Sequence, residues 1–354
     1  MSSFITINNR RVGPRFPVYV VAELSANHNK NFNQAVELIK VAKDCGADAI
    51  KLQTYTANTM TIRSDRDFFR IYGDTPWDGQ TLYDLYQEAS MPWEWQPKLK
   101  IIANSLGMDL FSSAFDTSAI SFLESMNVPV HKIASPEIVD IQLIENMAHT
   151  GKPLIISTGM ATLQEISEAV KTARRAGATQ IVLLKCTSSY PASLNDLNLR
   201  TLLHLSKTFN VPVGFSDHTL GTIAPIAAVV LGSCIIEKHL TLSRSIEGPD
   251  STFSLEPQEF KVLVESIRQV ENSLGQVYYG VTESEFGSRN FRRSLFVVEN
   301  IKAGEVFTVD NVRSIRPACG IPSKHLKELL GRKAAKNIEK GTPLKWELIK
   351  KKEQ

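Results

Sequence analysis

Polar side chains able to do chemistry recur at one position along the chain, directly after short runs of Val, Ile and other apolar residues. A lone polar residue at such a position is more often a structural group than a functional one. Eight successive runs end in this way, in Glu23; Lys51 and Gln53; Ser112 and Ser113; Lys132 and Ser135; Ser157; Ser188 and Tyr190; Ser216 and His218; and Glu237 and His239. Ammonium and hydroxyl donors each bind an oxygen of phosphate or carboxylate. The pattern therefore predicts a pocket for an anion with many oxygens, a phosphate or a phosphocarboxylate.

Two histidines, His218 and His239, end the last two of these runs. Two imidazoles at neighbouring strand ends, with Glu23 opposite, would suit Mn²⁺, Co²⁺ or Mg²⁺ with positions left open for water. The alternative is that one histidine is a general base or is only hydrogen-bonded. Lys185 and Lys238 lie an odd number of residues before the serine or histidine that ends their run, so their side chains should point to the opposite face of the sheet. We therefore expect structural roles for both lysines.

The elements that carry these residues follow a strand–helix rhythm from residue 17 to about residue 273. The predicted strands are Val18–Glu23, Ala47–Gln53, Met108–Ser112, Val130–Ala134, Pro153–Ser157, Gln180–Cys186, Val211–Ser216 and Cys234–His239. The predicted helices are Phe32–Cys45, Glu94–Leu106, Thr117–Met126, Ile141–Thr150, Leu163–Ala176, Leu199–Thr208, Ile223–Leu231 and Pro257–Leu274.

Alternating strands and helices with nearly continuous apolar strands indicate a parallel sheet covered by helices. Eight units in about 260 residues predict an α/β fold, a closed (β/α)₈ barrel of the TIM-barrel type, with its active site at the C-terminal strand ends. An open doubly wound sheet is the alternative. A dinucleotide-binding version is disfavoured because Val21–Ser25, and no G-x-G-x-x-G, follows the first strand.

The second unit departs from this pattern, since some 40 residues separate Gln53 from Glu94. Many of them are aromatic, including Phe68, Phe69, Tyr72, Trp77, Tyr83, Tyr86 and Trp93. Connections of this length are usually lids or binding loops. The helical pattern of Leu82–Tyr86 indicates a folded insert.

The rhythm ends at Leu274. We expect a barrel domain over residues 1–274, a linker over residues 275–290 and a small β-rich domain over residues 291–354. Within the small domain, Asn300–Phe307 and Asn337–Leu344 are similar at an offset of 37 residues. This similarity predicts two related turns in which glycine provides the reversal.

The composition is that of a globular protein, with 43% hydrophobic and 22% charged residues among 354. It excludes wholesale disorder, collagen and a disulfide-stapled miniature fold. No apolar run approaches the roughly 18 to 20 residues of a membrane span, and Met1–Phe4 shows no secretory signal. We therefore expect a cytoplasmic protein without membrane contacts. Cys45, Cys186, Cys234 and Cys319 form no Cys-x-x-Cys pair, and buried free thiols are expected.

The charge of the chain is unevenly distributed. The net charge is 40 − 37 = +3, but from Arg289 onward 16 Lys and Arg face 7 Asp and Glu, leaving −6 for the first 288 residues. A basic small domain fits an anionic small ligand or an acidic partner surface. Because no basic motif interleaved with aromatics is present, we expect no nucleic-acid partner.

Several segments resemble the sialic acid synthase family. They are Ala22–His28, Lys51–Tyr55, Lys132–Glu137, Ser157–Met160, Gly214–His218, Glu237–His239, Gly248–Asp250 and Phe253–Leu255. The stretch from Arg292–Leu295 through Arg316 and Pro317 to Gly331–Ala334 is similar to the antifreeze-like (SAF, β-clip) domain that these enzymes carry. The resemblance covers essentially the whole chain, with the motifs in the family's order.

Within this family, Tyr72–Gly79, Leu82–Tyr86 and Arg244–Glu247 most resemble pseudaminic acid synthases. The resemblance implies metal-dependent condensation of phosphoenolpyruvate with an N-acetylated amino sugar, 2,4-diacetamido-2,4,6-trideoxy-L-altrose. The products would be pseudaminic acid and phosphate, released with C–O cleavage. The alternatives in the family are N-acetylneuraminate and legionaminate synthases, which act on other N-acetyl amino sugars.

The resemblance also implies roles for single residues. Phosphoenolpyruvate would be held by Lys51, Ser113, Lys132, Ser135, Ser157, Ser188 and Ser216. His218 and His239 would bind the metal, and Glu23 would order its water or transfer a proton. The residues facing the sugar would be Gln53, Tyr190 and Asp250. Where the family commonly has Asn, this chain has the shorter Ser188, which leaves the phosphate contact there open.

The last implied site residue, Arg316, would come from the SAF domain of the other subunit, in a homodimer with exchanged SAF domains. Two other classes of function stay open. Lysines at barrel strand ends also serve Schiff-base aldolases, for which Lys51, Lys132, Lys185 and Lys238 are candidates. A carbohydrate-binding protein without catalytic activity is the non-enzymatic alternative.

Overall fold

The computed structural model describes residues 4–73 and 75–351 and contains two compact units, Met1–Gly275 and Gln276–Gln354. Each unit is described separately. Asp74 of the Tyr72–Gly79 segment and Met1–Ser3 of the N-terminal segment lie outside the described residues.

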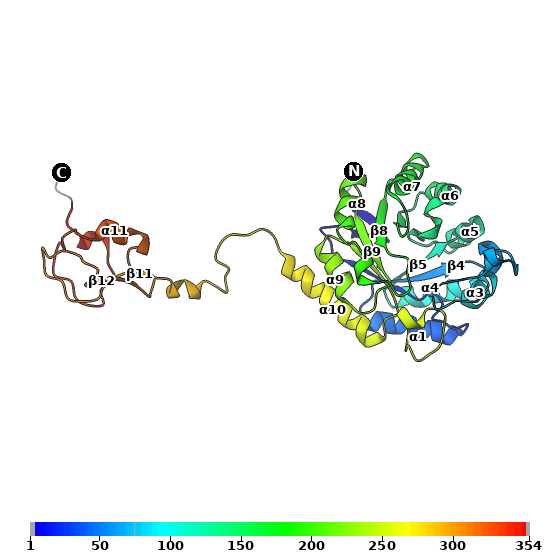
Figure 1. The fold of residues 1–354 in the computed structure, drawn as a ribbon, viewed down its shortest axis with the longest axis horizontal. Coiled ribbons are helices and arrows are strands. Elements are labelled where there is room, and N and C mark those ends of the chain that lie inside the picture. Colours follow the sequence, from blue (N-terminus) through cyan, green and yellow to red (C-terminus); the bar gives the residue numbers. More distant parts are fainter. Residues whose placement is uncertain (1–3, 74, 352–354) are drawn as a thin grey trace. The chain divides into compact units, whose positions relative to one another are not determined.

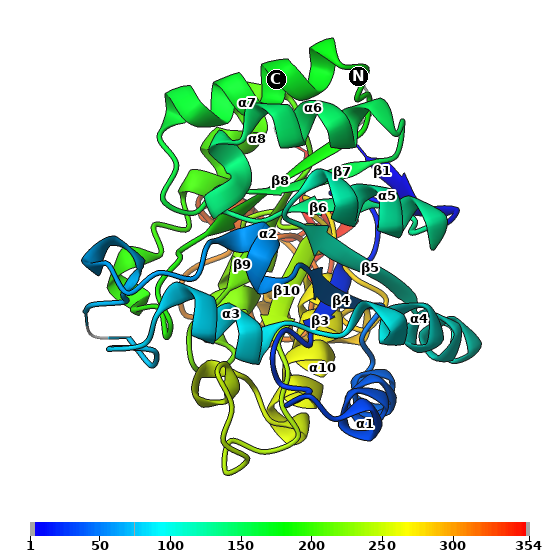
Figure 2. The same ribbon diagram turned by 90° about the vertical axis from the view of Figure 1, so that its right-hand side faces the viewer.

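The first unit is built around a closed parallel barrel of eight strands in the order β10-β3-β4-β5-β6-β7-β8-β9. Figures 1 and 2 show its helices packed around the outside. The strands are β3 (Tyr19–Glu23), β4 (Ala49–Thr54), β5 (Asp109–Ala114), β6 (His131–Ile133), β7 (Leu154–Ser157), β8 (Ile181–Cys186), β9 (Val213–Asp217) and β10 (Ile235–His239). The predicted (β/α)₈ fold is confirmed. The alternative of an open doubly wound sheet is excluded, because the last strand, β10, pairs with the first barrel strand, β3, and closes the sheet.

The helices between the strands match the predicted amphipathic stretches to within a few residues. They are α1 (Phe32–Asp44), α4 (Gln96–Ser105), α5 (Thr117–Ser125), α6 (Ile141–His149), α7 (Leu163–Arg175), α8 (Thr201–Phe209), α9 (Ile223–Val230) and α10 (Pro257–Leu274). Their starts follow from local sequence. Asp116 caps α5, and Thr162 forms a capping box with Glu165 at α7, which satisfies backbone N–H groups left free by the first turn.

The N-terminal end of the barrel is covered by a hairpin of β1 (Ile5–Ile7) and β2 (Arg10–Val12), which the sequence analysis did not predict. Its apolar side chains, Ile5 and Ile7 among them, join the barrel core. Arg10 pairs with Asp48, just before β4. Strands of three residues are too short to give a recognisable period.

The insert after β4 is folded, as expected. It contains α2 (Ala57–Met60), a 3₁₀ turn η1 (Asp67–Phe69) and α3 (Leu82–Ala89). Ile71 pairs with Gln80 and Gly79 through backbone hydrogen bonds of 2.9 Å each, and these bonds close the loop between η1 and α3. Further 3₁₀ turns are η2 (Trp93–Trp95), η3 (Pro136–Val139), η4 (Leu194–Asp196) and η5 (Ser251–Phe253).

The second unit contains a two-stranded antiparallel sheet of β11 (Ser294–Val297) and β12 (Val312–Ile315), joined by isolated bridges and a helix α11 (Leu326–Leu329). Its 3₁₀ turns are η6 (Gly287–Phe291), η7 (Ser323–His325) and η8 (Trp346–Leu348). The two similar segments pair with each other, since Ile301 and Ile338 exchange backbone hydrogen bonds of 2.9 and 2.8 Å. Gly304 and Gly341 have positive φ values of 86° and 88°, as the predicted reversals require.

Among the described residues, none of the helices combines the length and apolarity that crossing a membrane requires.

Candidate active site

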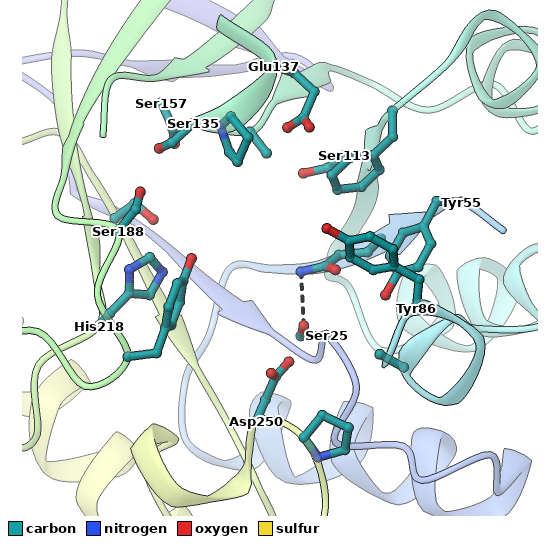
Figure 3. Close-up of a pocket in the computed structure, with 18 of the residues that line it drawn as sticks. Ser25, Tyr55, Tyr86, Ser113, Ser135, Glu137, Ser157, Ser188, His218 and Asp250 are labelled. Atoms are coloured by element: carbon teal, nitrogen blue, oxygen red, sulfur yellow. Dashed lines mark hydrogen bonds between the residues drawn. The ribbon is translucent and has the colours of Figure 1, made fainter. Parts of the chain in front are cut away.

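A cavity of about 450 Å³ lies at the C-terminal ends of the barrel strands (Figure 3). Twelve of the fourteen predicted site residues line it: Lys51, Gln53, Ser113, Lys132, Ser135, Ser157, Ser188, Tyr190, Ser216, His218, His239 and Asp250. Strand register explains the convergence. Glu23 is paired in register with both Lys51 and His239, and Ser113 with Lys132, so neighbouring strands present these side chains in common layers.

Lys51 lies between two carboxylates. Its ammonium contacts Glu23 and lies 3.5 Å from Glu237 Oε1 and 3.4 Å from Ser113 Oγ. Burial by itself lowers the pKa of Lys51, but Glu23 and Glu237 outweigh this effect and raise the pKa, so the lysine stays charged. Burial raises the pKa of Glu23 to about 7, against the opposing effect of Lys51. This buried triad can hold both an anion and an exchangeable proton.

Lys132 supplies the second cation of the cavity. Its Nζ donates hydrogen bonds to Ser157 Oγ at 2.7 Å and to Ile133 O at 3.0 Å. Among the described residues it makes no ion pair, and burial lowers its pKa. Lys51 and Lys132 therefore place two donors at the cavity wall, one paired with carboxylates and one able to pair with a bound anion.

Two of the predicted serines, Ser135 and Ser188, lie against Gly159, in the loop after β7. The Gly159 N–H donates to Ser135 Oγ at 3.0 Å. A Cβ at Gly159 would lie 2.7 Å from this oxygen and 2.3 Å from Ser188 Oγ. Ser188 therefore reaches the same part of the cavity as Ser135 despite being shorter than asparagine. Ser157, which accepts a hydrogen bond from Lys132, lines the same cavity, so hydroxyl groups and an ammonium group suited to an anion share it.

Replacement of Gly159 by alanine is expected to raise the KM for an anionic substrate about tenfold or more. The new methyl group displaces two hydroxyl donors, and a hydrogen bond to a charged group contributes about 1.5–3 kcal/mol. Steady-state kinetics tests this expectation. The matched control is Gly287→Ala, where a Cβ meets nothing within 4 Å. An unchanged KM for Gly159→Ala would show that these serines do not bind the anion.

The two histidines face each other as predicted, with ring centroids 5.3 Å apart. His218 Nδ1 lies 3.0 Å from Thr187 O, a contact that fixes the orientation of the ring. His239 has a buried Nδ1 without a hydrogen-bond partner. Burial and the neighbouring His218 lower the pKa of His239, so its imidazole is neutral, as a ligand must be. Burial lowers the pKa of His218, but the neighbouring Cys186 and the Thr187 carbonyl outweigh burial and raise it. The pair would hold a divalent metal with both rings neutral.

In this structure Glu23 pairs with Lys51 and not with the two histidines, and its role in ordering water or transferring a proton stays a prediction. Its carboxylate contacts Lys51 and lies 3.3 Å from Gln53 Nε2, because β3 and β4 pair Glu23 directly with Lys51. Glu23 is fully buried and does not line the cavity. Among the described residues, no three His, Cys, Asp or Glu side chains are grouped to hold a metal ion. Water and substrate would complete the coordination.

The remaining predicted residues lie beside the histidines. Tyr190 packs over His218 with ring centroids 4.3 Å apart and against Trp77 at 5.5 Å. Asp250 is buried and accepts a hydrogen bond from Ala26 N at 3.2 Å. Gln53 Nε2 donates to Ser25 Oγ at 2.9 Å, the bond drawn in Figure 3. These groups offer donors and acceptors suited to hydroxyl and amide groups.

Three further polar residues of the cavity, Glu237, Glu137 and Cys186, were not among the predicted site residues. Glu237 accepts a hydrogen bond from Ser216 Oγ at 3.0 Å, in addition to its contact with Lys51. Glu137, on η3, has a buried Oε2 without a partner, and burial raises its pKa to about 7. Cys186 lies with its Sγ 3.8 Å from His218 Nδ1. Glu237 lies two residues before His239 on the same strand, so both side chains point to the same face. This spacing could have identified Glu237 from the sequence.

The two lysines expected to be structural do not line the cavity. Lys238 pairs with Asp217 at 2.6 Å, and Lys185 donates to Cys186 O at 2.6 Å. The expectation that all four cysteines are buried is wrong for Cys319, which is exposed in the second unit. Arg316 also lies in the second unit, directly after β12, and is exposed. Its contribution to a partner's site stays a prediction.

A closed (β/α)₈ barrel with buried lysines, hydroxyl groups and two histidines at its strand ends defines an enzyme with a site for a phosphorylated or carboxylated substrate. The NeuB family model matches residues 38–279, more than half of the chain, and the SAF domain model matches residues 292–350. The chain belongs to the NeuB family and is a nonulosonic acid synthase, with the SAF domain that the sequence predicts.

Named relatives span nearly the whole chain. A pseudaminic acid synthase from Helicobacter pylori is 46% identical over 93% of this chain and 96% of its own length. An N,N'-diacetyllegionaminic acid synthase from Legionella pneumophila is 36% identical over 95% of this chain and 96% of its own length. The crystal structure of the N-acetylneuraminic acid synthetase from Leptospira borgpetersenii, in complex with citrate, matches with a TM-score of 0.72 and 31% identity. It covers 81% of this chain and 95% of that one.

Proposed function

We propose that this enzyme condenses phosphoenolpyruvate with 2,4-diacetamido-2,4,6-trideoxy-L-altrose to give pseudaminic acid and phosphate. The observation that carries the proposal is the cavity with Lys51, Lys132 and a set of hydroxyl groups at one side and two histidines beside it. The choice of sugar is supported by the higher identity to the pseudaminic acid synthase, 46%, than to the legionaminic acid synthase, 36%.

In this mechanism the lysines and serines bind the anionic substrate. Lys51, Ser113, Lys132, Ser135, Ser157, Ser188 and Ser216 would together hold the phosphate and the carboxylate of phosphoenolpyruvate. The phosphate and carboxylate charges persist throughout the reaction. Fixed cationic donors in a water-poor cavity therefore stabilise charge without reorganising as the reaction proceeds.

The sugar aldehyde would lie beside His218 and His239. A divalent metal held by the two imidazoles would act as a Lewis acid on the aldehyde and lower the pKa of a bound water. The phosphoenolpyruvate methylene attacks the aldehyde carbon, and water adds to C2. Phosphate then leaves with C–O cleavage. Glu23 is suited to hold or release the proton that these steps exchange, because its pKa of about 7 lies near neutral pH.

Phosphate release from phosphoenolpyruvate in the presence of Mn²⁺ tests this function. We expect release with 2,4-diacetamido-2,4,6-trideoxy-L-altrose, little release with N-acetylmannosamine, and loss of both in EDTA with recovery on adding Mn²⁺ back. Release with N-acetylmannosamine alone would leave the family assignment intact and overturn the choice of sugar. Unchanged activity in EDTA would show that the reaction does not depend on a metal ion.

The two rival functions predict different results in the same assay. A carbohydrate-binding protein would bind the sugar and release no phosphate. A Schiff-base aldolase would be insensitive to EDTA and would be trapped by borohydride. Lys132, with its lowered pKa, is the candidate that the cavity offers, whereas Lys51 is held charged by its carboxylates.

We further propose that the enzyme acts in the cytoplasm as a homodimer with exchanged SAF domains, in which Arg316 of one subunit reaches the sugar in the other. The positive charge of the small domain supports this arrangement, because one of the two substrates, phosphoenolpyruvate, is anionic. Analytical ultracentrifugation with an activity assay checks it. A monomer with full activity would contradict the proposal.

A further inference from the structure

The cavity has two chemically different sides. The strand ends supply lysines, serines and histidines, whereas the insert between β4 and α4 supplies Met60, Ile71, Trp77, Leu82, Leu85 and Tyr86. Figure 3 shows Tyr55 and Tyr86 facing Ser188 and His218 across the cavity. We call the insert side the apolar wall.

The apolar wall does not arise because the insert as a whole has an apolar sequence. The insert carries many charged residues, but among its described residues no charged side chain lines the cavity. The Arg63 guanidinium instead lies over the Tyr83 ring, with its Cζ 4.2 Å from the ring centroid. It also pairs with Asp84, and both side chains of this pair are exposed. The fold therefore sorts charged side chains outward and apolar side chains toward the cavity.

The apolar wall is also held in place by specific contacts. The Tyr55 ring packs edge-on against Tyr86 and Phe115, with centroids 5.8 and 5.2 Å apart. Trp77 Nε1 donates to Pro249 O at 2.9 Å, which ties the insert to the loop that carries Asp250. A wall fixed in this way is formed before substrate binds, and it selects by shape and polarity.

We infer that the apolar wall recognises the non-reacting end of the sugar and selects sugars that carry methyl or N-acyl groups, rather than hydroxyl groups, at that end. The inference rests on the proposed function, which places the reacting aldehyde beside the histidines. A methyl group gains free energy when it is buried against Ile71 and Leu82. A hydroxyl group packed against these two aliphatic side chains would lose its water without gaining a hydrogen-bond partner from them.

A matched pair of sugars and a matched pair of variants test this inference. The sugars are 2,4-diacetamido-2,4,6-trideoxy-L-altrose and its 6-hydroxy counterpart, which differ by one hydroxyl group. The variants are Ile71→Asn, in the apolar wall, and Ile62→Asn, in the same insert but 63% exposed and outside the cavity. Affinity for each sugar is measured by calorimetry with full-length protein, and phosphate release is measured separately.

We expect the wild-type enzyme to prefer the 6-deoxy sugar by about 10- to 100-fold, the range over which apolar pockets discriminate. Ile71→Asn should reduce this preference at least about fivefold, and Ile62→Asn should leave it unchanged. An equal effect of both variants, or no preference in the wild-type enzyme, would overturn the inference. Leu82→Gln provides the same test if Ile71→Asn does not fold.

The two readouts separate the inference from the proposed function. Absence of phosphate release by the wild-type enzyme with either sugar would contradict the proposed function, while the calorimetric preference would still test the apolar wall. Phosphate release without any preference for the 6-deoxy sugar would support the function and overturn the inference about the wall.

Discussion

Replacement of Lys51 by methionine is expected to lower kcat/KM about 100- to 1000-fold and also to destabilise the fold by about 3–5 kcal/mol. The loss of activity follows from removing a preorganised cation from the anion site. The loss of stability follows from burial, because Glu23 and Glu237 would lose the ammonium group that lies between them. Removing one partner of a buried ion pair leaves an uncompensated charge.

A second substitution separates the two effects of Lys51. In the Lys51→Met, Glu23→Gln double variant one of the two buried carboxylates is neutral, so we expect most of the stability to return while activity stays low. Chemical denaturation and steady-state kinetics measure the two quantities. Lys40→Met is the control, because its pair with Glu37 is exposed and contributes less than about 1 kcal/mol. Stability of Lys51→Met equal to that control would contradict the expected cost of leaving the two buried carboxylates unpaired.

The barrel could be predicted because its signal is periodic. Each parallel strand is buried on both faces, so it appears as a continuous apolar run, and each helix has one buried face. β6 illustrates the limit of this signal. The apolar stretch Val130–Ala134 was expected to be a strand, whereas only His131–Ile133 pairs with its neighbours. Hydrogen-bond register decides strand ends, and composition does not reveal it.

The site could be predicted where a residue ends a strand and could not where it lies in a loop. Strand ends converge in every barrel of this type, so Lys51, Lys132 and His239 could be placed together. Glu137 lies on a 3₁₀ turn with no period, and the contacts of Tyr86 depend on how a long insert folds back. Loop side chains are placed by tertiary packing that no local pattern encodes.

The pairing of Glu23 shows a different limit. Its position at the end of a strand was predicted, but its partner was not, since a strand end faces the residues of both neighbours. The register pairs Glu23 with Lys51 on one side and His239 on the other. Lys51 pairs with the carboxylate because opposite charges attract strongly in a buried site, and the two histidines are left without a carboxylate partner from Glu23.

Replacement of Lys132 by methionine is expected to lower kcat/KM by a similar factor, about 100- to 1000-fold, but to change the stability by no more than about 1–2 kcal/mol. Unlike Lys51, this buried lysine makes no ion pair among the described residues, and burial lowers its pKa. Loss of its hydrogen bonds to Ser157 and Ile133 is offset by removing a cation that is costly to bury.

The contrast between the two lysines distinguishes an anion site from a Schiff-base site. If Lys132 only binds the anion, the wild-type enzyme is not trapped by borohydride in the presence of sugar and phosphoenolpyruvate, and Lys132→Met raises mainly the KM for phosphoenolpyruvate. If Lys132 is a nucleophile, borohydride adds substrate mass to the peptide that contains it, and Lys132→Met abolishes both turnover and trapping. Mass spectrometry of the trapped protein decides between them, because the stability of the variant is expected to be near that of the wild type in either case.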